Sequence, residues 1–184
     1  MGRLLVTAIC SVDGYVADTH GSFEFAFPSA EVHQAVNDLE RGVGTQLLGR
    51  RTYEIMTYWE TVPTEGDDPE ADFARLWTGA DKVVFSTTLT EVATPRTRLV
   101  PAFDAAEVRA LVEASPHDVE IGGPTLAAEA WRAGLVEEVR LFLVPAVVGG
   151  GLPALPEGVR TNLTLLDQRT FENGTLLLQY AVRH

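Results

Sequence analysis

The chain has 184 residues, of which 46% are hydrophobic and 22% charged, a composition typical of a folded globular protein. Its net charge of −12 at pH 7 argues against general binding to nucleic acid or anionic membranes, although local cations and backbone N–H groups can still hold a phosphate. No apolar run approaches the roughly 20 residues of a membrane span. The single cysteine, Cys10, excludes an internal disulfide and is expected to be a buried thiol. We therefore expect one cytoplasmic domain over residues 1–184.

Short apolar runs alternate with helical periodicity along the chain, beginning with a buried strand over residues 4–10. Ser29 and Asp104 are expected to cap helices that end near residues 41 and 114. The segment 15–28 is expected to be a long loop. The pattern predicts strands over residues 4–10, 46–48, 82–85, 98–100, 119–121, 139–148, 163–171 and 175–182, and further helices over residues 50–57, 71–77 and 125–134.

The order of these elements predicts the fold class. Repeated strand–helix units indicate a mostly parallel sheet with helices on both faces. Asn173-Gly174 between the last two strands is a strong hairpin signal, and Pro145 suggests that its strand lies at an edge or carries a bulge. The sequence therefore predicts a three-layer α/β/α fold with a mixed sheet and an antiparallel C-terminal hairpin.

Three predicted strands end in turns of the kind that bind phosphate: residues 48–53, 85–88 and 120–126. The first has two arginines at a helix start, the second has consecutive hydroxyls, and the third has a glycine pair before a helix. Each also has an ordinary structural explanation: solvated arginines, a capped turn, and glycines that serve only packing. Because the carboxyl ends of parallel strands share one sheet edge, the three turns together indicate a ligand site.

Four strings carry a family resemblance: SVDGYVA (11–17), LLGRRTYE (47–54), VVFSTTL (83–89) and IGGPTLAAEAWRAGLVEEVRLFLVPAVVGGGLPAL (121–155). In this order they resemble the reductase domain of the bifunctional deaminase-reductase of riboflavin biosynthesis and its stand-alone relatives. The resemblance covers nearly the whole chain. It implies a dihydrofolate reductase-like fold and NADPH as cofactor.

The resemblance also assigns cofactor contacts to particular positions. It places the NADPH phosphates at the start of the second helix, the adenosine phosphate at the serine-threonine turn, and the nicotinamide at the backbone of the first strand. It further implies a cis peptide within the glycine pair. The implied cofactor-binding residues are Ile9, Gly49, Arg50, Arg51, Thr52, Ser86, Thr87, Gly122, Gly123, Pro124, Thr125 and Leu126.

Residues for catalysis and substrate binding are less constrained. Asp13 is the catalytic candidate because it follows the first strand beside the expected nicotinamide, although Asp-Gly also suffices as a turn-former. Glu31 lies near the place where dihydrofolate reductases keep a pterin-binding carboxylate, and Glu24 precedes it. Glu31 also suits the positive end of a helix dipole. Tyr53 and Trp59 are candidate walls of the substrate pocket, although aromatics at this spacing are also typical of a core.

The function predicted is an NADPH-dependent reductase of a pyrimidine- or pterin-like small molecule. Its type would be 5-amino-6-(5-phosphoribosylamino)uracil reductase or dihydrofolate reductase. The riboflavin step requires a ribose phosphate site, and no second basic cluster stands out for it. The alternative is a non-catalytic module that binds NADPH or another nucleotide.

Two further expectations concern metals and partners. The four histidines, His20, His33, His117 and His184, do not cluster in the sequence, so no metal site is expected. The apolar segment 141–155 is more hydrophobic than a solvent-exposed edge should be, and family relatives commonly dimerise. We therefore expect a homodimer that acts on a small molecule.

Overall fold

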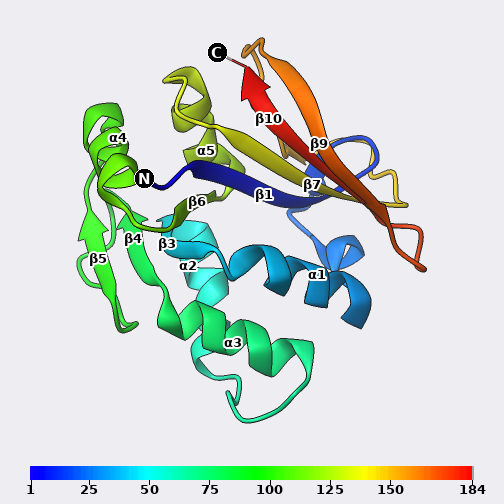
Figure 1. Ribbon diagram of the computed structural model, residues 1–184, viewed down its shortest axis with the longest axis horizontal. Coiled ribbons are helices and arrows are strands. Elements are labelled where there is room, and N and C mark those ends of the chain that lie inside the picture. The colour runs from blue at the N-terminus through cyan, green and yellow to red at the C-terminus, as the bar shows by residue number, and fades with distance from the viewer. Residues whose placement is uncertain (184) are drawn as a thin grey trace.

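The computed structural model describes residues 1–183, in which a central sheet is flanked by helices on both faces (Figure 1). The sheet has eight strands in the order β5-β4-β3-β6-β1-β7-β10-β9. The strands are β1 (Leu4–Ser11), β3 (Val43–Gly49), β4 (Asp81–Phe85), β5 (Thr97–Val100), β6 (Asp118–Gly122), β7 (Glu138–Val144), β9 (Asn162–Thr170) and β10 (Leu176–Arg183). Within this eight-stranded sheet only the β7–β10 and β9–β10 pairs are antiparallel, which confirms the predicted mixed sheet and hairpin.

Five α-helices connect or follow these strands within residues 1–183: α1 (Ala30–Glu40), α2 (Arg50–Met56), α3 (Pro69–Gly79), α4 (Ala105–Ala114) and α5 (Pro124–Arg132). The predicted loop over residues 15–28 contains a short strand, β2 (Tyr15–Ala17), and a 3₁₀ turn, η1 (Glu24–Ala26). A second 3₁₀ turn, η2 (Thr57–Glu60), extends α2. The strand β8 (Leu152–Pro153) pairs with β2 and was not predicted, because its glycine- and proline-rich surroundings hide a two-residue strand.

The prediction for the strand over residues 139–148 was wrong about its position in the sheet and about its last residue. β7 lies between β1 and β10 rather than at an edge, and it stops at Val144. Pro145 therefore ends the strand instead of sitting in an edge or bulge, which agrees with its missing N–H donor.

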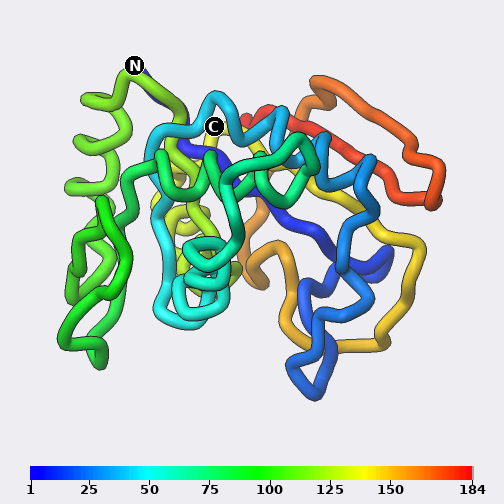
Figure 2. The backbone as a smooth tube through the Cα atoms, turned by 90° about the horizontal axis from the view of Figure 1, so that it is seen from below, coloured from blue at the N-terminus to red at the C-terminus, as the bar shows by residue number. Residues whose placement is uncertain are grey.

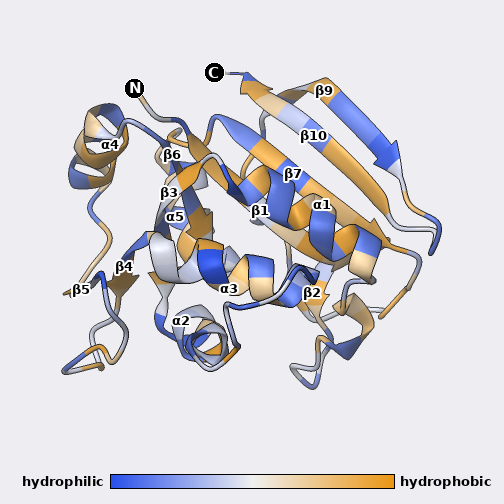
Figure 3. Cartoon of the chain, turned by 60° about the horizontal axis from the view of Figure 1, so that its bottom comes forward, coloured by the Kyte–Doolittle hydropathy of each residue, from blue (hydrophilic) through white to orange (hydrophobic). Residues whose placement is uncertain are grey.

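The two faces of the sheet bury separate apolar clusters. Alternate residues of a strand point to opposite faces, so Leu47 packs with α4 and α5 while Leu48 packs with α2 and α3. α1 covers the part of that second face around Phe142. Figure 3 shows hydrophobic and hydrophilic residues alternating along α1, as a helix with one buried face requires. Each fully buried leucine contributes about 1.5–3 kcal/mol.

The turns after β3, β1 and β7 lie along one edge of the molecule (Figure 2). β4, β3, β6 and β1 are neighbours in the sheet, and β3 pairs in parallel with both β4 and β6. The carboxyl ends of these strands therefore share that edge, where open α/β sheets bind their ligands. The described part of the chain contains no helix long and apolar enough to cross a bilayer.

Candidate functional site

The three phosphate-type turns come together at the edge of the sheet. Gly49 is the register partner of Phe85 on one side, and Leu48 is the partner of Gly122 on the other. The turns that follow β3, β4 and β6 are therefore neighbours in space, although these strands end at residues 49, 85 and 122. The sheet order, rather than the order along the chain, creates the site.

Two of these turns are packed tightly against each other. Gly123 has a φ of +90°, and a Cβ atom built there would lie 2.4 Å from Thr52 Oγ1. A Cβ at Gly122 would lie 3.0 Å from Leu48 Cδ2. The glycine pair thus lets the β6–α5 turn approach the start of α2, which no larger residue permits without movement. The resemblance had implied a cis peptide here, but no cis peptide bond occurs within residues 1–183.

The helices at this edge differ from the others in their capping. Ser29, Asp68 and Asp104 accept hydrogen bonds from the first N–H groups of α1, α3 and α4. α2 and α5 begin at Gly49 and Gly123, which have no side chain to do this. The first N–H groups of α5 therefore have no side-chain cap, and they carry the positive end of the helix dipole. That arrangement suits a phosphate oxygen.

Charged and hydroxyl side chains join the β3 and β4 turns. Arg50 donates to Glu54 Oε1 at 2.7 Å and to Thr88 Oγ1 at 2.9 Å. Ser86 Oγ accepts from the N–H groups of Thr88 and Leu89, so it shapes the turn. Arg51 is exposed and forms no hydrogen bond or ion pair in the part of the chain described. Arg51 is thus more available to a ligand than Arg50, a distinction that the sequence did not provide.

Thr87 is exposed beside these groups, and Thr88, which we had not selected, is the residue that holds Arg50. The run of three hydroxyl residues was the available signal for Thr88. Thr125 is exposed and Pro124 and Leu126 are half-buried in the first turn of α5. These residues lie where the sequence predicted a cofactor, and their binding role stays a prediction.

The first strand, β1, lacks a pairing partner on one side near the same edge. β1 pairs with β6 only at Leu4 and Leu5, whereas its pairing with β7 continues to Ser11. The second half of β1 therefore has no ladder partner on its β6 side. Thr7, Ala8 and Ile9 are correspondingly half-exposed in the middle of the sheet. Backbone groups left unpaired in this way are available to a flat polar ligand, as the resemblance implied for Ile9.

Asp13 acts as an anchor for the loop after β7. Its carboxylate accepts from the N–H groups of Val148 at 3.2 Å and Gly149 at 2.8 Å. Hydrogen bonding with the Ser11 side chain, followed by these backbone groups, lowers the pKa of Asp13 below its usual value. Asp13 is therefore ionised at neutral pH, and it is a poor proton donor. The turn-forming interpretation describes what this geometry shows, while a direct contact with ligand stays a prediction.

The two candidate glutamates differ in their surroundings. Glu31 accepts from Arg169 at 2.9 Å and from the N–H group of Glu172 at 3.2 Å, so it ties α1 to the C-terminal hairpin. The Glu172 N–H group and then Arg169 lower the pKa of Glu31. Glu24 is exposed on η1, and no partner for its carboxylate occurs among residues 1–183. Glu24 is thus the carboxylate free to meet a substrate.

The two candidate aromatic residues, Tyr53 and Trp59, also differ in their surroundings. Tyr53 is only 4% exposed, and its hydroxyl bonds Thr94 and accepts from the Ala93 N–H group. Tyr53 therefore belongs to the core beside Trp77, and we withdraw it as a substrate wall. Trp59 is half-buried on η2 and packs on Phe73 with ring centres 4.6 Å apart. Its role as a substrate wall stays a prediction.

Comparison with known proteins shows the family. Residues 3–177 match the family model of the RibD C-terminal domain, so the chain belongs to that reductase-like family. It is 25% identical over 181 residues to the uncharacterized protein YyaP of Bacillus subtilis, covering 97% of this chain and 94% of that protein.

Solved structures share the fold. A Shewanella sp. PV-4 protein whose description names riboflavin biosynthesis superposes with a TM-score of 0.77 at 20% identity, over 99% of both chains. A pyrimidine reductase-like protein of Corynebacterium diphtheriae has a TM-score of 0.68 at 13% identity, covering 100% of this chain and 92% of the other. A deaminase/5-amino-6-(5-phosphoribosylamino)uracil reductase of Thermotoga maritima has a TM-score of 0.67 at 16% identity, and this chain spans 57% of it. The predicted dihydrofolate reductase-like architecture is confirmed.

No group of three or more His, Cys, Asp or Glu side chains that could hold a metal is present within the described chain, from which His184 is excluded. Of the remaining histidines, His33 is buried, and its ring contacts the rings of both Trp59 and Phe73, with ring centres 5.6 and 5.7 Å away. Burial lowers the pKa of His33, so its neutral form is favoured. This histidine belongs to the packing of α1 on α3.

Proposed function

We propose that the chain is an NADPH-dependent reductase of a pyrimidine- or pterin-like small molecule. The observation that carries the proposal is the shared edge of β4, β3, β6 and β1, where an uncapped α5, a glycine cradle and an unpaired strand backbone meet. Membership in the RibD C-terminal domain family supports the reaction class.

The residues present fit a dinucleotide. The N–H groups that open α5 and the exposed Arg51 would hold the phosphates, and the Thr87 hydroxyl would meet the adenosine end. The unpaired side of β1 around Ile9 would hold the nicotinamide amide through backbone groups. When bound, NADPH would supply a hydride to an electron-poor C=N or C=O bond of the substrate.

The protein's part in the reaction would be positioning and the exclusion of water. Asp13 fixes the backbone at Val148 and Gly149, and thereby holds the loop after β7 over the end of β1. Glu24 and Trp59 are the proposed substrate contacts. Because Asp13 is ionised, we propose that it positions this loop, and that the proton accompanying the hydride comes from another group or from water.

Titration of the purified protein with NADPH, followed by nicotinamide fluorescence, tests the cofactor. We expect saturable binding below 1 mM and weaker binding of NADH, in the range that such metabolite sites usually show (about 1 μM to 1 mM). R51Q should weaken NADPH binding about tenfold, because it removes a charge-assisted contact. R109Q, an exposed arginine of α4, is the matched control and should bind as the wild type does. No saturable binding by the wild-type protein would refute the proposal.

The second candidate is a nucleotide-binding module without turnover, and the observation in its favour is that both oxygens of the Asp13 carboxylate accept from backbone N–H groups of the loop after β7, so the catalytic candidate is occupied as a loop anchor. Turnover of any member of a panel of aminouracils, pterins and quinones would exclude the module. NADPH binding without oxidation across that panel would favour it. D13N separates the roles of Asp13: a positioning role predicts faster amide exchange at Gly149, whereas loss of turnover with unchanged exchange would indicate a chemical role.

A further inference from the structure

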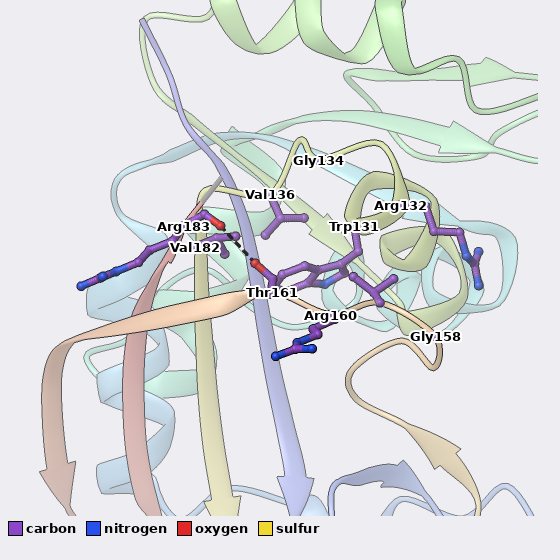
Figure 4. Close-up of a pocket in the computed structure, with 10 residues that line it drawn as sticks. Trp131, Arg132, Gly134, Val136, Gly158, Arg160, Thr161, Val182 and Arg183 are labelled. Carbon is purple, nitrogen blue, oxygen red and sulfur yellow. Dashed lines mark hydrogen bonds between the residues drawn. The ribbon is translucent and has the colours of Figure 1, made fainter.

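A cavity lies at the end of α5 opposite to the glycine pair. It has a volume of about 500 Å³ and lies between the end of α5, the segment 158–161 and the end of β10 (Figure 4). α5 spans nine residues, or about 13 Å at the usual helical rise, so its two ends belong to separate sites. The proposed reductase function makes no use of this cavity.

The charge of the cavity contrasts with that of the protein. Three arginines, Arg132, Arg160 and Arg183, are among the ten residues that line it, and none of the ten is an aspartate or glutamate. The chain as a whole has 26 acidic and 14 basic residues. A cluster that collects three cations without an acid in its lining is therefore the reverse of the average surface and indicates a negatively charged ligand.

The three arginines differ in how many hydrogen bonds and ion pairs their guanidinium groups form with neighbouring residues. Arg132 pairs with Glu129 at 2.8 Å, and both side chains are about half exposed, so solvent weakens that pair. Arg183 donates to Thr164, and its carbonyl oxygen accepts from the Thr161 hydroxyl at 3.2 Å. Arg160 forms no ion pair or hydrogen bond with any residue from 1 to 183. At least one guanidinium therefore has its full donor set available.

The cavity also has apolar walls. Figure 4 shows the Trp131 indole between the side chains of Val136 and Arg160. Val182 and Val159 line the same space. Trp131 is 7% exposed, and its indole N–H is buried without an acceptor among the described residues. That nitrogen has less than 1 Å² of accessible surface, so the donor itself does not open into the cavity.

We propose that this cavity binds a small organic anion in which a phosphate or carboxylate is attached to a ring. The guanidinium groups match both kinds of oxyanion, and the tryptophan and valines require an apolar body. The volume lies within the usual range for small-molecule sites and far exceeds what an inorganic ion fills. The carboxyl end of α5 disfavours an anion through its dipole, so the site depends on its arginines.

Calorimetric titration of the full chain with AMP, UMP, FMN and 4-hydroxybenzoate tests the proposal, with adenosine and inorganic phosphate as the separated halves of a ligand. We expect at least one of the four anions to bind with 1:1 stoichiometry below about 1 mM, and both halves to bind at least about tenfold more weakly. Binding should weaken as NaCl is raised from 50 to 500 mM, because salt screens exposed charges. Absence of binding by all four anions below that limit would overturn the proposal.

Variants distinguish this cavity from the cofactor site whether or not NADPH binds there. R132Q/R160Q should weaken the anion at least about tenfold, because it removes two charge-assisted contacts. R98Q/R109Q removes the same charge from exposed arginines outside the cavity and should leave the affinity within about twofold. Equal losses in both double variants, or loss in neither, would refute the assignment. Urea midpoints should confirm that both variants fold, since all four side chains are exposed.

Discussion

Substitution of Gly123 by alanine tests whether the glycine cradle shapes the candidate cofactor site. At a φ of +90° an alanine is strained, and its Cβ would lie 2.4 Å from Thr52 Oγ1 and 3.4 Å from Thr52 Cβ. The backbone strain alone costs about 1–3 kcal/mol, and Thr52 or the turn must also move. We expect G123A to lower the free energy of unfolding by about 2–3 kcal/mol and NADPH affinity by more than tenfold.

Urea unfolding followed by tryptophan fluorescence measures the stability, and NADPH titration measures the site. Gly79, at the end of α3, is the matched control because an added Cβ meets nothing within 4 Å there and no positive φ is required. G79A should leave NADPH binding unchanged. The double variant G123A/T52A should recover part of the lost stability, because the Oγ1 overlap is gone. If G123A and G79A have equal stability and affinity, the cradle argument is wrong.

Three further outcomes follow from buried and exposed groups. Burial and the neighbouring Glu120 carboxylate raise the pKa of Glu40 well above 4.5, so the folded state loses stability as pH rises from 4.5 through that raised pKa. The free energy of unfolding, measured in urea, should be higher for E40Q than for the wild type by about 1 kcal/mol or more at pH 8 and by less at pH 5. The control E113Q, at an exposed position, should show no such difference. Equal pH dependence of the unfolding free energy in E40Q and the wild type would contradict the argument. Burial raises the pKa of the Cys10 thiol to about 11. A thiol reagent at pH 8 should therefore label Cys10 only after denaturation. Rapid labelling of the native protein would contradict the burial of Cys10. We propose a homodimer through the apolar segment 141–155, in which Val147 is 75% exposed. Light scattering should give about twice 20.0 kDa for the wild type and less for V147K, and a monomeric wild type would refute the proposal.

The strands and helices were predictable because periodicity and caps are local signals. Ser29 and Asp104 accept from the first N–H groups of their helices as the sequence indicated. The Asn173-Gly174 turn joins the antiparallel pair at the C-terminus. Cys10 is buried, as its apolar run predicted. These features depend on neighbours within a few residues, which a single sequence displays directly.

The features that decide the site depend on distant residues, and they were not predictable. Nothing local shows that the Tyr53 hydroxyl bonds Thr94, 41 residues further along, and that its ring is buried in the core. Asp13 and Gly149 are 136 residues apart, so the loop anchor could not be separated from a simple turn. The basic cavity was missed for the same reason, since α5, the segment 158–161 and β10 contribute its arginines separately.

The sheet determines the two ends of the proposed site in different ways. The phosphate-type turns lie where parallel strands end, and any parallel order of β4, β3 and β6 would have placed them on one edge. The space beside β1 instead depends on where its pairing with β6 stops, after Leu5, while its pairing with β7 continues to Ser11. The end of that pairing depends on residues far apart in the sequence, so the periodicity of the chain predicts the turns at the sheet edge but not the space beside β1.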